Sequence, residues 1–302
     1  MGIKLCLSIA FFALMLFLNP AAKALAAEDG LPAYKVGRAI VYPINDMDIA
    51  MPLKLFSGGN SKELATKLST DSMPAGMRAF LVKTEGKTIL IDAGIGQAGK
   101  SQLMENLKKI GITPEQIDSI LLTHMHFDHV GGLIWNDQPA FPKAEILVSA
   151  QEKDFWFSDE AMKSNPEKKD NFELARKAIN LYGDNARIFV YGDEVAPGLT
   201  AMDASGHTPG HTAFMLDSAG SSMLFWGDTM HGAALQFADP RICPDFDMDK
   251  EKAVQNRLNM LHLATEKNIP VAGHHLPDPG IVLIKPGQDG DAFNYEDLAA
   301  FN

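Results

Sequence analysis

Cysteine is nearly absent from this chain: its 302 residues include only two, Cys6 and Cys243. A fold with so few cysteines cannot depend on a disulfide framework, so it must rest on its hydrophobic core. If the first residues are removed on export, as argued below, Cys243 is left without a partner. It could be a metal ligand, but it stands apart from the histidine clusters, and we interpret it as a buried or mildly reactive thiol.

Positive charge is also scarce. Lys and Arg total 27 against 38 Asp and Glu, which gives a formal net charge of −11, and the basic residues form no stripe or cluster. Binding to a nucleic-acid backbone needs such a patch, so we expect no nucleic-acid partner. The fractions of hydrophobic residues (46%) and charged residues (22%) are those of an ordinary globular protein.

Long apolar runs are missing after the first residues. Lys4 precedes an apolar run over residues 5–18, and Ala24-Leu25-Ala26 follows it. This arrangement predicts a secretory signal peptide over residues 1–26, followed by one domain over residues 27–302. The run is shorter than the roughly 20 residues that span a bilayer, and an uncleaved N-terminal anchor is the alternative. We therefore expect a periplasmic or secreted protein without membrane contact after cleavage.

Histidine, by contrast, is concentrated. The stretch "THMHFDHVGG" (residues 123–132) holds three of the nine histidines, one aspartate and two glycines. A lone histidine is more often an ordinary core or surface residue than a ligand. Packing several imidazoles against a carboxylate is costly, however, unless a cation stabilises the group. The stretch therefore predicts a metal site.

Strand and helix patterns mingle along the chain. Two hairpins are predicted, over residues 77–94 and 212–228, with turns at Glu85-Gly86 and Ala219-Gly220. Apolar periodicity predicts helices over residues 100–111, 163–180 and 250–267, and strands over residues 34–44, 144–150 and 269–275. Because hairpins occur in both halves, we expect two β-sheets packed together with helices outside. This is an αββα sandwich of the α/β class.

Metal-binding residue types occur at four places, each directly after a predicted strand. They are His124-x-His126-x-Asp128-His129, then His207 and His211, then Asp228, and finally His274 and His275. Because loops after neighbouring strands can meet at one rim of a sheet, we expect these side chains to converge. Imidazole and carboxylate without thiolate suit zinc, manganese or iron.

This ordered set resembles the metallo-β-lactamase superfamily in its dinuclear hydrolase form. The resemblance covers nearly all residues after the signal peptide, including "ILIDAG" at residues 89–94. It implies that one metal ion is held by His124, His126 and His207, that a second is held by Asp128, His129 and His275, and that Asp228 bridges both. His274 is the alternative to His275, which we prefer because "HLPDPG" resembles the stretch carrying the last ligand in relatives. His211 is expected to support the ligands, and His262 to be an ordinary residue.

The chain is most similar to the methyl parathion hydrolase group and its lactonase-like relatives. The stretches "THMHFDHVGGL", "AFPKAEILVSAQEKDFW", "GHTPGHT" and "AALQFADP" carry this resemblance. True β-lactamases of the superfamily lack the bridging aspartate, so Asp228 argues against β-lactam hydrolysis. RNA-processing members need a nucleic-acid surface that the charge of this chain does not supply.

Four further residues have both a structural and a functional interpretation. His231 lies three residues after Asp228, where lactonases have a tyrosine that assists the carbonyl oxygen, so it is a candidate catalytic residue or else a rim histidine. Phe155 and Trp156 match pocket residues of parathion hydrolases, although aromatics at a helix start usually belong to the core. Phe127, inside the first motif, is a third candidate for the substrate pocket.

No Gly-x-Ser-x-Gly motif occurs, so covalent catalysis lacks a nucleophile. The resemblance implies a hydroxide that bridges two divalent metal ions, expected to be zinc, with manganese, cobalt or iron as alternatives. Asp228 bridges these ions and is a candidate proton acceptor. We expect hydrolysis of small uncharged esters, lactones or phosphotriesters.

Two other functions stay open at this stage, a mononuclear-iron redox enzyme such as a persulfide dioxygenase and a non-catalytic metal-binding protein. The partner we expect is a small-molecule substrate. A homodimer is a further expectation, because the apolar residues 47–56 could cover a partner subunit.

Overall fold

The computed structural model describes residues 23–25, 31–98, 100–287 and 292–298. The expected signal peptide lies outside the described residues except for β1 (Lys23–Leu25), and it stays a prediction. In the part of the chain that is described, no helix combines the length and the apolar character needed to cross a bilayer.

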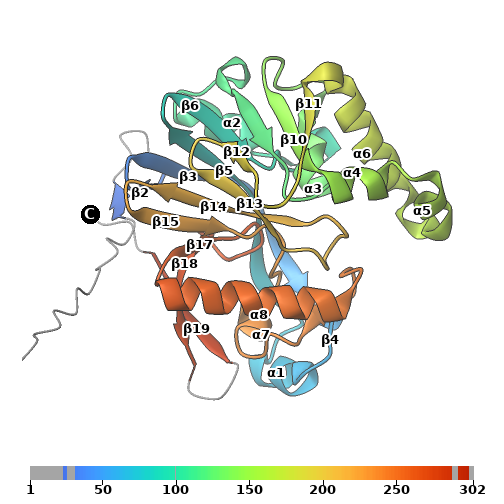
Figure 1. Ribbon diagram of the computed structural model, residues 1–302. Coiled ribbons are helices and arrows are strands. Elements are labelled where there is room, and N and C mark those ends of the chain that lie inside the picture. Colours follow the sequence, from blue (N-terminus) through green and yellow to red (C-terminus); the bar gives the residue numbers. More distant parts are fainter. Residues whose placement is uncertain (1–22, 26–30, 99, 288–291, 299–302) are drawn as a thin grey trace, which may run out of the picture.

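Two β-sheets lie face to face and form the centre of the molecule (Figure 1). The first has the strand order β1, β2 (Ala33–Val36), β3 (Ala39–Pro52), β5 (Ser72–Thr84), β6 (Lys87–Ile91), β7 (Ser119–Leu121), β10 (Glu145–Ser149) and β11 (Ala186–Phe189). The second has the order β12 (Glu194–Ala196), β13 (Leu199–Asp203), β14 (Thr212–Ser218), β15 (Ser221–Phe225), β17 (Pro270–Ala272), β18 (Ile281–Pro286) and β19 (Phe293–Asp297). Two short pairs join β4 (Phe56–Ser57) to β16 (Cys243–Pro244) and β8 (Ile134–Trp135) to β9 (Gln138–Pro139).

Helices cover the outer faces of both sheets. On the first sheet lie α2 (Leu103–Lys109), α4 (Ala150–Trp156) and α6 (Lys169–Tyr182), and on the second lies α8 (Lys250–Lys267). The shorter helices are α1 (Ser61–Leu68), α3 (Phe127–Val130), α5 (Asp159–Ser164) and α7 (Ala233–Gln236). The order of layers is helix, sheet, sheet, helix, so the predicted αββα sandwich is confirmed.

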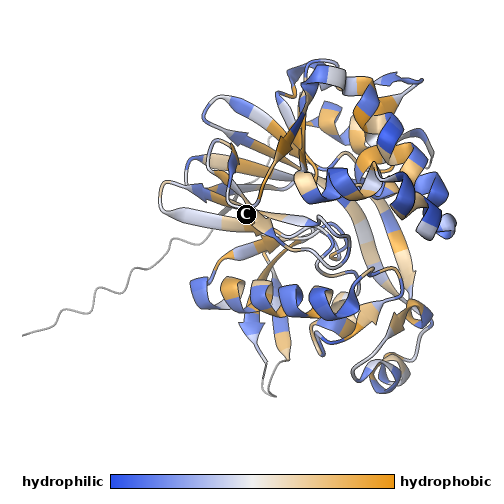
Figure 2. Cartoon of the chain, turned by 45° about the vertical axis from the view of Figure 1, so that its right-hand side comes forward, coloured by the Kyte–Doolittle hydropathy of each residue, from blue (hydrophilic) through white to orange (hydrophobic). Residues whose placement is uncertain are grey.

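Hydrophobic packing follows these layers. Between the sheets, Phe80 of β5 meets Phe225 of β15 with ring centroids 5.6 Å apart. A second cluster lies between the first sheet and its helices, and a third lies under α8. Figure 2 shows the matching pattern, with hydrophobic colour along the strands and hydrophilic colour on the outward faces of the helices. A core of this kind holds the strand ends, and hence the loops after them, in fixed positions.

Both predicted hairpins are confirmed. The turns Glu85-Gly86 and Ala219-Gly220 have positive φ at both residues, which suits the twist of the strands they connect. The helices predicted over residues 100–111 and 250–267 correspond to α2 and α8.

Two predictions of local structure were wrong. Residues 34–44 form two strands instead of one, because the chain turns at Gly37, whose φ is +59°. A Cβ added there would lie 1.7 Å from the carbonyl oxygen of Ser218, so only glycine fits this turn. The helix predicted over residues 163–180 is interrupted at Pro166, and α6 begins at Lys169.

The apolar residues 47–56 lie at the end of β3 and in the segment leading to β4. Met51, Leu53 and Phe56 are buried within this chain, where they pack with Leu235 and Ile242. This packing removes the reason for which a partner subunit was expected here, and the homodimer stays a prediction.

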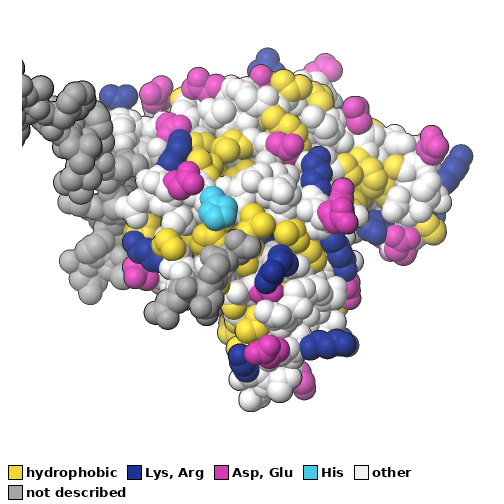
Figure 3. Space-filling model, turned by 60° about the horizontal axis from the view of Figure 1, so that its bottom comes forward, with side chains coloured by type: hydrophobic (Ala, Val, Ile, Leu, Met, Phe, Trp, Pro, Cys, Tyr) yellow, Lys and Arg dark blue, Asp and Glu magenta, His cyan; other side chains and the backbone are white. Residues whose placement is uncertain are grey.

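Acidic and basic side chains are interspersed over the face of the molecule seen in Figure 3. No continuous basic patch appears on that face. The expectation that nucleic acid is not a partner stays a prediction.

Candidate metal centre

The loop after β7 carries the first four candidate ligands, His124, His126, Asp128 and His129. It turns back at once into the single helical turn α3, and the amides of His129 and Val130 both donate to the carbonyl of His126. The glycines that follow allow a close approach, because a Cβ at Gly132 would lie 1.8 Å from the carbonyl oxygen of Ala93. The sharp turn therefore points all four side chains towards one place.

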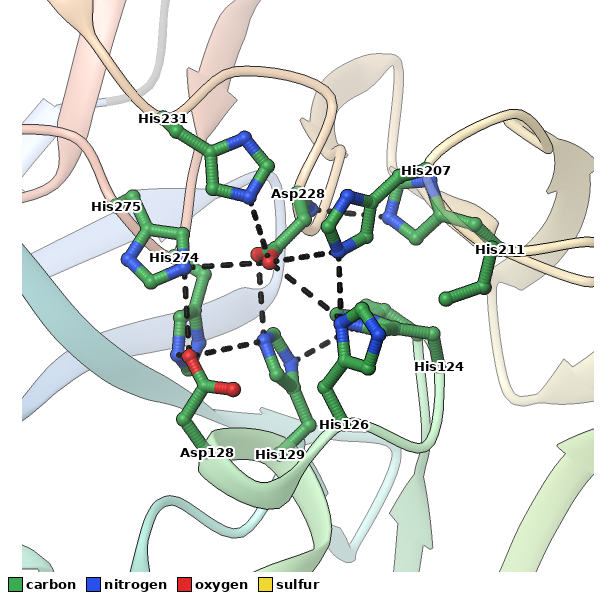
Figure 4. A network of polar contacts seen from close by, with 12 residues as sticks. His124, His126, Asp128, His129, His207, His211, Asp228, His231, His274 and His275 are labelled. Atoms are coloured by element: carbon green, nitrogen blue, oxygen red, sulfur yellow. Dashed lines mark hydrogen bonds and ion pairs between the residues drawn. The ribbon is translucent and has the colours of Figure 1, made fainter. Parts of the chain in front are cut away.

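The remaining candidates come from three loops at the same rim. His207 lies between β13 and β14, Asp228 follows β15, and His274 and His275 follow β17. Figure 4 shows these side chains converging on Asp228 from different loops. The structure thus brings together all seven residues that the resemblance assigned to the metals.

One group of donor atoms lies around His126. Its Nδ1 is 3.0 Å from Nε2 of His124 and 2.9 Å from Nε2 of His207. With Asp228, these three residues place their ligand atoms within 4.8 Å of one another. Burial lowers the pKa of His126 and that of His207 to about 3. The rings are therefore neutral and carry the lone pairs that a metal requires.

A second group consists of Asp128, His129, His274 and His275, again with ligand atoms within 4.8 Å. Burial by itself would lower the pKa of His275, but the carboxylates of Asp228 and Asp128 outweigh it and raise this pKa to about 10. The same balance, led by Asp228, raises the pKa of His129 well above its ordinary value. The carboxylates thus attract positive charge to this buried group, which is the charge that a divalent cation supplies.

Asp228 lies between the two groups. Its Oδ1 is 3.3 Å from Nε2 of His129, and its Oδ2 is 3.3 Å from Nε2 of His207 and 3.2 Å from Nε2 of His275. Burial would raise the pKa of this carboxyl, but the surrounding histidines, led by His275, hold it well below its usual range. An ionised carboxylate in this position can be shared by two metal ions.

The donor set also fits metal ions because several buried donor atoms have no hydrogen-bond partner. These atoms include Nε2 of His129 and Oδ1 of Asp228. Unpaired buried polar atoms are costly, so bound cations would satisfy a need that the protein leaves open.

Most of the ligand histidines are oriented through the nitrogen that faces away from the centre. Nδ1 of His207 is 2.9 Å from Oδ1 of Asp247, and Nδ1 of His129 is 2.8 Å from Oδ2 of Asp92. Nδ1 of His275 donates to the carbonyl of Gly76 at 2.8 Å. Metal-binding histidines usually have such a partner. His274 has none, and this difference favours His275 as the ligand.

Glu152 joins the two histidine loops, and the sequence analysis missed it. Its carboxylate accepts hydrogen bonds from the amide of Met125 (2.9 Å), from Trp156 Nε1 (2.6 Å), from the hydroxyl of Thr208 (2.8 Å) and from the amide of Gly210 (2.9 Å). Burial raises its pKa, while these four donors act in the opposite direction. Glu152 therefore fixes the loop of His124 and His126 relative to the loop of His207.

His211 and His262 lie where they were expected to lie. Nδ1 of His211 donates to the carbonyl of Ala204 at 2.8 Å, and its Nε2 accepts the amide hydrogen of Asp228 at 2.9 Å. Nδ1 thus fixes the ring to Ala204, and Nε2 holds the backbone of the shared aspartate. His262 is exposed and its ring meets Phe293 edge to face. Cys243 is a buried free thiol.

A cavity of about 380 Å³ opens directly above the two groups of donor atoms. Its wall includes His231 and Phe127, which is 44% exposed, and it is completed by Ile49, Met51, Met77, Lys168, Asn171 and Phe246 together with the ligands His126, Asp128, His207, Asp228 and His275. This is the size of a site for a small molecule, and its walls beyond the metal-binding residues are mainly apolar.

The structure does not place Phe155 or Trp156 in the wall of this cavity. Trp156 is fully buried in the core, and its indole donates to Glu152 behind the ring of His126. Phe155 is half-buried and packs on Trp156 and Phe172. The pocket role predicted for these two aromatics is corrected to a structural one, whereas Phe127 does line the cavity.

Two groups of imidazole and carboxylate donors that share one aspartate, at the rim of an αββα sandwich, define the class of dinuclear metal-dependent hydrolases. Residues 78–274, well over half of the chain, match the family described as the metallo-beta-lactamase superfamily. The chain belongs to this superfamily.

Individual relatives agree with this assignment. The chain is similar to an N-acyl homoserine lactonase of a Bacillus species, with 26% identity over 161 residues. The matched residues are 46% of this chain and 57% of the lactonase, so the chain spans little more than half of the length of that relative. The crystal structure of AbOPH, a hydrolase in the beta lactamase superfamily, has 30% identity and a TM-score of 0.81, and covers 91% of this chain and 97% of that one. AidC, a dizinc quorum-quenching lactonase in complex with an N-acyl-L-homoserine product, has 23% identity and a TM-score of 0.80. That match covers 93% of this chain and 99% of AidC.

Proposed function

We propose that this protein hydrolyses small uncharged lactones, esters or phosphotriesters, and lactones in particular. The observation that carries this proposal is the position of the shared donor groups, which form the floor of a cavity whose other walls are mainly apolar. Such walls bind a neutral substrate better than a charged one, because an ionised group loses its hydration there. The lactonases among the relatives support lactones within this class.

The ligands divide into two sets with one shared member. His124, His126 and His207 would hold one divalent ion, Asp128, His129 and His275 a second, and Asp228 both. When bound, such a pair makes water nucleophilic near neutral pH and polarises a carbonyl or phosphoryl oxygen. The chain keeps the ligands in place through Asp92, Asp247 and Glu152, and its apolar walls limit the access of bulk water.

His231 is the non-ligand polar side chain of the cavity that contacts the shared aspartate. Its Nε2 is 3.0 Å from Oδ2 of Asp228, and its ring stacks on His275 with centroids 4.8 Å apart. Burial lowers its pKa to about 3, so the ring is neutral and the proton at Nε2 points to the carboxylate. We propose that this N–H donates a hydrogen bond to an oxygen of the substrate, as an oxyanion partner.

Replacing His231 by Leu should therefore lower kcat about 100-fold, which is the low end of what one oxyanion hydrogen-bond donor contributes. His231→Gln should lose less, because an amide still donates a hydrogen bond. Both variants should keep the metal content of the parent protein, measured by elemental analysis beside the kinetics. Unchanged kcat in the Leu variant would remove His231 from the mechanism.

The substrate class can be tested with protein that begins at Ala27 and is loaded with zinc or manganese. A medium-chain lactone, an aryl dialkyl phosphotriester and an aryl phosphomonoester are compared by kcat/KM, each with a chelator control. We expect chelator-sensitive turnover in which the lactone is preferred and the charged monoester is poor. Strong phosphomonoesterase activity without lactonase or esterase activity would overturn the proposal. A preference for the phosphotriester would change the proposed substrate from a lactone to a neutral phosphotriester.

We also propose that the chain is exported and cleaved before Ala27, which places the enzyme in the periplasm or the medium. The short apolar run and the Ala-x-Ala site support this proposal. Expression of the full chain in a Gram-negative host, followed by fractionation and intact mass measurement, should give an exported form that starts at Ala27. A full-length form in the membrane fraction would instead indicate the uncleaved anchor.

A further inference from the structure

Arg257 is a fully buried arginine of α8 that binds no candidate metal ligand directly. Its Nε donates to the carbonyl of Thr229 at 2.7 Å, and Nη1 donates to the carbonyls of Pro240 (2.7 Å) and Ile242 (3.0 Å). Nη2 is 3.2 Å from Oδ2 of Asp247, which is itself buried. A buried ion pair of this kind is weak evidence for stability, because apolar replacements are often as stable. The contacts of Arg257 therefore indicate a role other than stabilising the fold.

The contacts of Arg257 lead to both parts of the metal centre. Thr229 directly follows Asp228, so the bond to the carbonyl of Thr229 holds the loop of the shared aspartate. On the other side, Asp247 uses its second oxygen, Oδ1, to orient Nδ1 of His207 at 2.9 Å. One guanidinium thus fixes two ligands that come from different loops.

The same contacts reach the wall of the cavity. Phe246, next to Asp247, lines the cavity and packs edge to face against His231, with centroids 4.8 Å apart. The amide of Met248 donates to the carbonyl of His207 at 3.2 Å. The segment 246–248 therefore carries a wall residue, the carboxylate that orients His207 and a backbone bond to the His207 loop. Arg257 anchors this segment through Asp247.

We propose that Arg257 is a positioning residue of the metal centre, which sets His207 and Asp228 relative to each other and places Phe246 beside them. This inference deepens the proposed function and rests on it for the presence of the metals. Its test is metal binding and not hydrolysis, so the two can fail separately.

The test compares Arg257→Met, Arg257→Lys and Asp247→Asn with the parent chain. Zinc affinity and stoichiometry are measured by competition with a chromophoric chelator, and the cobalt-substituted protein is examined by its absorption spectrum. Met260→Ala is the matched control, because Met260 is a buried residue of the same helix that packs in the core under α8. This control lowers the stability of the fold without touching the contacts of Arg257.

We expect Arg257→Met to weaken zinc binding about 10- to 100-fold, as replacements of groups that orient metal ligands do, and to change the cobalt spectrum. Arg257→Lys should recover part of the affinity, because the ammonium keeps the charge beside Asp247 but not the several directed bonds. The losses of Asp247→Asn and Arg257→Met should not add in the double variant, because both act on His207.

Three results would overturn the proposal. The first is parent affinity and an unchanged cobalt spectrum in Arg257→Met. The second is an equal loss of affinity in Met260→Ala, which would show that general destabilisation is the cause. The third is full additivity of the Asp247 and Arg257 losses. If Arg257→Met does not fold, the zinc affinities of Arg257→Lys and Asp247→Asn are compared with that of Met260→Ala. Equal zinc affinities in these three variants would contradict the proposal.

Discussion

Replacing Asp228 by Asn is expected to lower the metal content of the protein from two ions per chain towards one and to remove almost all turnover. The reason is the position of this carboxylate, which faces both donor groups: Oδ1 lies towards His129 of the second group, and Oδ2 lies towards His207 of the first and His275 of the second. The carboxylate also supplies negative charge at the point where both cations would meet, and an amide does not. Polarisation of the substrate by a metal is worth several kcal/mol, so kcat/KM should fall about 1000-fold.

The measurement is elemental analysis after gel filtration, combined with kcat/KM for the best lactone. Asp245→Asn is a suitable control, because Asp245 is an exposed aspartate that bonds Ser57 and Lys250 outside the donor groups. A variant of Asp228 that retained two metal ions and parent activity would show that the carboxylate is not shared. Loss of metal without loss of activity would contradict the proposed function itself.

The candidate ligands were predictable because each follows an apolar strand directly in the sequence. β7 ends at Leu121 and β15 ends at Phe225, so the polar residues just after them had to lie at a rim of a sheet. The family resemblance then ordered them into two sets. Spacing alone could not decide between His274 and His275, since adjacent residues in a loop are equivalent, and the preference for His275 rested on the resemblance of "HLPDPG". The structure adds a physical difference, the bond from His275 to the carbonyl of Gly76, 199 positions away in the sequence.

The groups that hold the ligands could not be predicted in the same way. Glu152 lies in a polar helical stretch, and nothing in its neighbours indicates that it contacts Met125 and Gly210, which lie 27 and 58 positions away. Asp247 and Arg257 likewise look like ordinary charged residues near the start of a helix. Their roles depend on which loops the fold brings beside them, and a single sequence does not contain that information.

Trp156 illustrates the opposite error. Trp156, like the adjacent Phe155, matches pocket residues of parathion hydrolases, and this match suggested a contact with the substrate. In the structure, the indole points inward and donates to Glu152, so the residue supports the back of His126. A one-residue difference along a helix turns a side chain by about 100°, and sequence spacing around a short helix such as α4 does not fix which face meets the cavity.

Glu152→Gln should be the most destabilising conservative substitution that we predict for this protein. All four partners of the carboxylate are donors, from Met125, Trp156, Thr208 and Gly210, so an acceptor-only group satisfies them all. An amide replaces one oxygen by an NH₂ group, which then faces donors in a site without water access. One buried donor left unpaired and weaker bonds to the others should lower the free energy of unfolding by about 3 kcal/mol.

The loss should also appear in metal binding, because Glu152 fixes the loop of His124 and His126 relative to that of His207. Urea unfolding with a chelator present would measure the free energy of unfolding of the metal-free protein. Competition with a chelator for zinc would measure the loss of zinc affinity. Glu173→Gln on α6 is the control, since that carboxylate is exposed and pairs only with Lys169 among the ion pairs of the described residues. If both glutamines were equally well tolerated, the four hydrogen bonds to Glu152 would not be holding the two histidine loops together. The geometry of the first donor group would then have to come from the sheets alone.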